Sequence, residues 1–145
     1  MTAPRWALWI LWAVFAALLA LELRVAYVIP PRPHPWYDAQ VAVAGFVLAL
    51  LSVLAAVGTF TLREMLAMRE IRRGSLDPNT PDGFARLRGM LMVLWSLCLV
   101  IGVLGVLLAW GAARPRAAWP YFLGAGALLA LHAPRRWLFA SGGRE

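Results

Sequence analysis

Residues 41–62 read VAVAGFVLALLSVLAAVGTFTL, a run of 22 residues without a charged side chain. At ~1.5 Å per residue, a helix of this length extends about 33 Å, enough to cross a hydrocarbon core of ~30 Å. No polar face recurs along the run, as it would in the surface helix of a soluble domain. Residues 41–62 therefore predict a transmembrane helix.

The helical pattern continues past this run into residues 63–73, REMLAMREIRR, without a glycine or proline. Gly74 is a natural helix stop. Thr80 and Pro81 then have the types preferred at an N-cap and at the first helical position. We predict one long second helix that leaves the membrane, and a cytoplasmic hairpin over residues 63–89 that leads into the third helix.

Three further apolar runs, at residues 6–29, 90–110 and 118–133, have the lengths of membrane spans, the last being the shortest. The chain is 62% hydrophobic and 14% charged, against about 45–50% and 25% in soluble domains. The first run is longer than the apolar core of a signal peptide, so we expect it to stay uncleaved. The sequence predicts an all-α integral membrane four-helix bundle, a single membrane domain over residues 1–145.

The orientation follows from the basic residues, all fourteen of which are arginines. With four spans, ten arginines fall on the side of the two termini and the second loop, and four on the other side. Arginine-rich loops stay in the cytoplasm. We expect a multi-pass protein of the bacterial cytoplasmic (inner) membrane with both termini in the cytoplasm.

Small residues allow helix backbones to approach closely in a membrane, and they recur every three or four residues in the second span. The candidate packing residues are Gly45, Ala49, Ser52, Ala56 and Thr59 in the second span, and Gly102 and Gly105 in the third. We expect this ridge of the second span to face the bundle interior. Large side chains are expected to meet lipid or a partner protein, among them Trp12, Leu19, Leu94 and Trp95.

Ionisable residues within membrane spans are functional candidates by default. Glu22 lies in the outer third of the first span, and Arg24 follows on the other side of the helix, too far around to pair with it directly. Four interpretations of Glu22 are open: a proton-coupled site, an ion ligand, a partner contact, or an interfacial side chain that reaches headgroup water.

His132, at the inner end of the fourth span, is the other candidate, since a membrane histidine can ligate haem or bind a quinone. His34 lies on the opposite side of the membrane, so a haem site would need a methionine or a second copy of the chain. Cys98 is the single cysteine, which permits neither an internal disulfide nor a thiolate metal site. We predict no metal and no cofactor, with haem or quinone near His132 as the alternative.

The hairpin carries arginines that can contact anionic headgroups, at about 1 kcal/mol each, or dock a cytoplasmic partner. These arginines are Arg63, Arg69, Arg72, Arg73, Arg86 and Arg88. Basic residues form no stripe outside the membrane ends of the spans, so nucleic-acid binding is not expected.

The sequence carries no nucleotide-binding loop, nucleophile elbow, zinc-helix motif or paired carboxylates at one membrane depth. We therefore expect a non-catalytic accessory or structural subunit of a larger membrane complex, with lipid and other membrane subunits as partners. The alternative is a small homo-oligomeric proton-coupled transporter that uses Glu22. A compact four-span chain with a carboxylate in its first span resembles the small multidrug-resistance exporters. Glu22 is off-centre, however, and the hairpin is longer than the short loops of that family.

Overall fold

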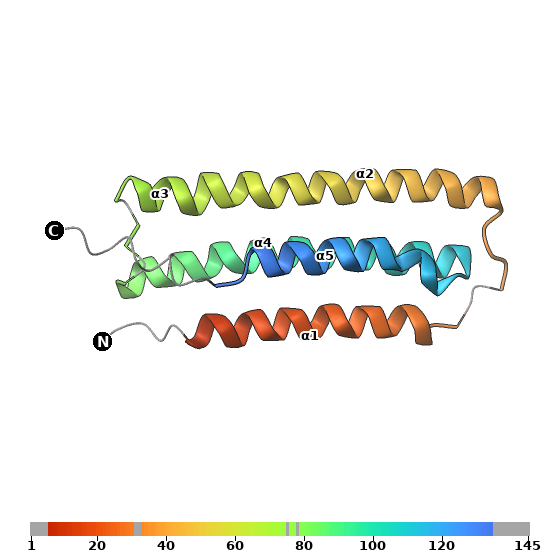
Figure 1. Ribbon diagram of the computed structural model, residues 1–145, viewed down its shortest axis with the longest axis horizontal. Helices are drawn as coiled ribbons and strands as arrows, with labels where there is room; N and C mark the ends of the chain where they lie inside the picture. The colour runs from red at the N-terminus through yellow and green to blue at the C-terminus, as the bar shows by residue number, and fades with distance from the viewer. Residues whose placement is uncertain (1–5, 31–32, 75, 78, 135–145) are drawn as a thin grey trace.

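The computed structural model describes residues 6–30, 33–74, 76–77 and 79–134, and this part of the chain is helical without a strand (Figure 1). Its helices are α1 (Trp6–Val28), α2 (Asp38–Leu62), α3 (Arg69–Arg72), α4 (Pro81–Ala112) and α5 (Trp119–Leu131). A π-helical turn, Arg63–Met68, joins α2 to α3, and a 3₁₀ turn, Pro115–Ala118, precedes α5. The prediction of an all-α chain is confirmed.

Three of these helices are long and apolar enough to cross a membrane: α1, the continuous helix from Asp38 to Ile71, and α4. This confirms the prediction of a transmembrane protein. The fourth long segment, α5, has 13 residues and is about 20 Å long at ~1.5 Å per residue.

The central helix is α4, which contacts α1, α2 and α5. In Figure 1, α1 and α2 run along opposite sides of the pair formed by α4 and α5. Buried residues occur along the whole of α4, whereas Thr59 is the buried residue of α2. The core therefore lies around α4, and α2 packs on it from one side.

The turn of the hairpin lies between the helix stop and the helix start predicted from the sequence. Gly74 has a positive φ of 71° just after α3, which glycine adopts without a steric cost. At the start of α4, the Thr80 Oγ1 accepts a hydrogen bond of 3.1 Å from the Gly83 amide, and Pro81 is the first helical residue. The cap satisfies one of the amides that a helix N-terminus leaves unpaired.

The long second helix is also confirmed, with one difference in its geometry. Its π-helical turn widens the helix so that the Arg69 amide donates to the Glu64 carbonyl, five residues back. Alanine, leucine, methionine, glutamate and arginine all favour an α-helix. Local propensity therefore does not explain the wider turn.

The expectation that Trp12, Leu19, Leu94 and Trp95 face lipid or a partner is wrong. Leu94 and Trp95 are 2% and 0% exposed and Leu19 is 9% exposed, and Trp12 is half-buried beside α5. In a membrane span both the lipid side and the packed side are apolar, so a large side chain does not reveal which side it faces.

Candidate functional site

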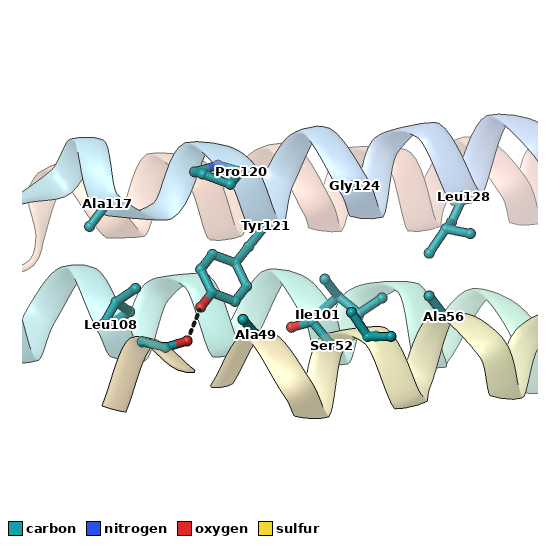
Figure 2. A pocket seen from close by; sticks show the side chains of 12 residues that line it. Ala49, Ser52, Ala56, Ile101, Leu108, Ala117, Pro120, Tyr121, Gly124 and Leu128 are labelled. Atoms are coloured by element: carbon teal, nitrogen blue, oxygen red, sulfur yellow. Dashed lines mark hydrogen bonds between the residues drawn. The ribbon is translucent and has the colours of Figure 1, made fainter. Parts of the chain in front are cut away.

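An apolar groove runs between α2 and α5 over the surface of α4, with a volume of about 510 Å³ (Figure 2). We call it the α2–α5 groove. It is lined by Gly45, Ala49, Ser52, Val53, Ala56, Ile101, Leu108, Ala117, Pro120, Tyr121, Gly124 and Leu128. The predicted packing ridge of α2 supplies four of these residues, so the ridge faces α4 and α5 but remains partly uncovered.

Both hydroxyl groups in the α2–α5 groove are used within the chain. The Ser52 hydroxyl donates to the Leu48 carbonyl at 2.8 Å, and the Tyr121 hydroxyl donates across the groove to the Gly45 carbonyl at 3.2 Å (Figure 2). A Cβ added at Gly45 would meet the Leu108 side chain at 3.9 Å, an ordinary van der Waals contact. The groove thus offers shape and apolar surface rather than reactive groups.

Gly102 and Gly105 lie where α4 approaches its other two neighbours. A Cβ added at Gly105 would lie 2.7 Å from the Tyr121 Cβ of α5. A Cβ added at Gly102 would collide with the Glu22 carboxylate of α1 and lie 2.9 Å from a Leu19 methyl group. Neither position has room for a Cβ, so both glycines allow their helices to approach closely here.

Glu22 lies on the face of α1 that packs against α4. Its Oε2 is buried and has no hydrogen-bond partner among the described residues. Arg24 is exposed and lies about 200° further around the helix. The structure therefore brings Glu22 to Gly102 of α4 and leaves Arg24 on the outside of α1.

The C-terminal end of α5 is held by three ring N–H groups. The Trp12 indole donates to the Leu129 carbonyl at 3.0 Å, and the Trp95 indole donates to the His132 carbonyl at 3.1 Å. The His132 Nδ1 lies 2.7 Å from the Leu128 carbonyl, which can only accept, so Nδ1 carries the proton. Carbonyls at a helix end need such partners, above all in an apolar surrounding.

His132 is 3% exposed, and its ring lies 5.4 Å from that of Phe60. Its Nε2 is buried without a hydrogen-bond partner among the described residues. His34, in the loop between α1 and α2, is exposed. No three histidine, cysteine, aspartate or glutamate side chains gather into a metal-binding group in the described part of the chain. The geometry gives His132 a packing and capping role at the end of α5.

The arginines of the hairpin differ in exposure. Arg69, Arg73, Arg86 and Arg88 are exposed and Arg63 is half-buried, while the side chain of Arg72 lies outside the described residues. The hairpin turn packs on its own apolar residues, with Leu76 3% exposed and Phe84 7% exposed. The exposed arginines thus stand on a folded support and remain available to headgroups or to a partner.

The ring N–H cap of α5 was not predicted from the sequence. Trp12 and Trp95 stand among apolar residues, and nothing along the chain links them to a carbonyl more than 30 residues away. Their indole N–H groups nevertheless require partners when buried, which was the available clue. No family model, curated protein or solved structure matches this chain significantly.

Proposed function

We propose that this chain is a small, non-catalytic subunit of a larger membrane assembly and that α2 docks against a transmembrane helix of another subunit. One observation carries this proposal: the small-residue ridge of α2 lines an open groove of about 510 Å³ instead of being covered by a helix of the same chain. The largest side chains of α2 are exposed as well, with Phe46 at 72% and Leu54 at 58%. Such a helix has far more apolar surface than α4 alone covers.

Helices associate in membranes through backbone approach at small residues, because lipid and protein surfaces are equally apolar. Gly45, Ala49 and Ala56 offer this approach along about three turns of α2. The hydroxyls of the groove are satisfied internally, so a bound helix would not have to supply polar partners there. These features favour packing against a helix over binding of a polar substrate.

The proposed topology has four spans, with both termini and the hairpin in the cytoplasm of a bacterial cell. The 13 residues of α5 and the four of the preceding 3₁₀ turn add up to about 28 Å at ~1.5 and ~2.0 Å per residue. This length nearly matches a hydrocarbon core of ~30 Å. The start of α1 and the end of α5 lie toward the end of the helix bundle that carries the hairpin (Figure 1), and the arginine bias favours the cytoplasm for that end.

The test is purification of the tagged, full-length protein from its native host in mild detergent, followed by mass spectrometry of the bound proteins. The key variant is Ala49→Phe, which places a ring in the α2–α5 groove. Its control is Gly58→Phe, because Gly58 lies about 180° around the same helix and a Cβ there meets nothing within 4 Å. We expect stoichiometric membrane partners with the wild type and Gly58→Phe, and their loss with Ala49→Phe. A homo-oligomer without partners would contradict the proposal.

A proton-coupled homo-oligomeric transporter is the second candidate function, favoured by the buried and unpartnered Oε2 of Glu22. A carboxyl group at such depth is costly as an anion and can therefore bind and release a proton during transport. This candidate predicts a homo-oligomer in detergent and proton-driven flux in liposomes that Glu22→Gln abolishes. A partner-bound protein without flux would contradict it.

A further inference from the structure

Glu22 occupies a core position of α1. Six of the buried and half-buried residues of α1 recur at alternating spacings of four and three along the helix. They are Leu8, Trp12, Phe15, Leu19, Glu22 and Ala26. This is the spacing of a helix–helix seam, and every other member of the seam is apolar or aromatic.

The carboxyl group has no countercharge within the described chain at this position. Its Oε2 rests at Gly102, where Leu19 and Phe122 also converge, and it accepts no hydrogen bond from a described residue. Glu22 lies six residues before the end of α1, or about 9 Å along its axis; with that end at the membrane surface, as in the proposed topology, Glu22 lies below the headgroups. An ionised carboxylate in such a place is stable only with a cationic or hydrogen-bonding partner.

Glu22 also lines a lateral groove between α1 and α4, which we call the α1–α4 groove. Its volume is about 270 Å³, and its other residues are aliphatic: Leu18, Leu21, Val25, Leu99, Val103 and Val106. Leu21 is 55% exposed and Val103 is 45% exposed, so the groove opens at the outer surface of the helix bundle. None of its lining residues comes from α2 or α5.

We propose that the α1–α4 groove receives a transmembrane helix of a partner subunit whose arginine or lysine side chain pairs with Glu22. The inference rests on the proposed function, in that it requires the chain to belong to a larger assembly. The groove lies below the usual ~300–1,000 Å³ of small-ligand pockets and is open along exposed aliphatic side chains. Its size and shape fit one side chain of a packed helix better than an enclosed ligand.

The charge of Glu22 would select the partner as well as hold it. A basic side chain in the partner span is itself costly in hydrocarbon, and the two groups lose that cost only when they meet. A partner helix without a basic residue at this depth would leave the carboxylate uncompensated, which disfavours the wrong pairing. The aliphatic walls of the groove would contribute contact area on either side of the pair.

The test compares partner capture by the tagged full-length wild type with capture by Glu22→Gln and Val103→Trp, in the native host. Glu22→Gln removes the charge at nearly constant side-chain shape, and Val103→Trp fills the α1–α4 groove while leaving the carboxyl group of Glu22 unchanged. Val100→Trp is the control, because Val100 is 47% exposed on the same helix and lies outside the groove. We expect at least about tenfold less partner with both groove variants, and unchanged capture with Val100→Trp.

The decisive step is a charge exchange. Glu22→Arg should lose the partner, and a partner variant with glutamate in place of its basic residue should restore capture. If the wild type holds a partner but Glu22→Gln holds it equally, this inference is wrong and the proposed function stands. If the wild type holds no partner, both are wrong. Elution volume and thermal unfolding of each purified variant separate lost binding from lost folding.

Discussion

The helices α2 and α4 are both long and apolar, but α4 lies at the centre of the bundle and α2 packs at its side. Both are apolar runs long enough to span a membrane; α4 begins within the hairpin at Pro81, and the helix that starts with α2 continues into the hairpin as far as Ile71. Yet α4 is packed on three sides, whereas Thr59 is the buried residue of α2. The difference shows that length and hydropathy alone do not determine which helix lies at the centre of the bundle.

The largest difference in stability between variants of α4 and of α2 is expected for a pair of glycine substitutions. Gly105→Leu in α4 forces a side chain against the Cβ of Tyr121, and we expect a loss of about 3 kcal/mol in the free energy of unfolding. Gly58→Leu in α2 meets open space and should be neutral or stabilising by up to about 1 kcal/mol, since leucine favours a helix over glycine. Unfolding of both proteins by denaturing detergent measures the difference, and equal losses would contradict the central position of α4.

Tryptophan variants should give the next largest effect. Trp95→Phe removes the indole that donates to the carbonyl of the buried His132 and should cost about 2 kcal/mol. Trp9→Phe removes an indole from a residue that is 50% exposed and should cost less than about 0.5 kcal/mol. Thermal unfolding in the same detergent compares the two variants. A Trp95→Phe protein as stable as the wild type would show that this hydrogen bond does not stabilise the end of α5.

The start of α4 can be tested at its N-cap. Thr80→Ala removes the oxygen that accepts the Gly83 amide and should cost about 1 kcal/mol. Thr61→Ala in α2 removes an exposed hydroxyl that donates to the Val57 carbonyl within the helix and should change stability little. Amide hydrogen exchange at residues 82–84 should rise in Thr80→Ala alone, and unchanged exchange would mean that the cap does not stabilise the start of α4.

The smallest effect is expected where the loop after α4 meets the start of α2. Arg114 and Asp38 lie 3.6 Å apart with side chains 71% and 93% exposed. Solvent and salt screen such a pair, so Asp38→Asn should leave the thermal unfolding temperature unchanged within error. A clear loss of stability would show that α2 depends on this contact.

The helix boundaries were largely predictable because breakers and caps act locally. Gly74, Thr80 and Pro81 are recognisable by residue type, and they end and start the helices where expected. The membrane character of three helices was also predictable from their length and composition. These properties depend on a few consecutive residues and on the solvent they require.

The faces of the helices were less predictable, because nearly every residue of a span is apolar. Trp95 and Leu94 were expected at the surface and are buried. The position of Glu22 on the packed side of α1 could have been predicted, since the seam from Leu8 to Ala26 has a regular spacing in the sequence. Its contact with Gly102 was not, because two residues 80 positions apart meet only once the helices are packed.

The π-helical turn Arg63–Met68 has a consequence for how this helix tolerates the insertion or deletion of a residue. A hydrogen bond to the fifth preceding residue takes in one residue more than an α-helical turn does, and one residue corresponds to about 100° of rotation. Deleting a single residue here would restore an ordinary α-helical turn, and the residues beyond it would keep their orientation relative to the ridge of α2. The turn therefore absorbs one extra residue that, in a regular α-helix, would rotate the arginine-bearing end relative to the helix surfaces inside the membrane.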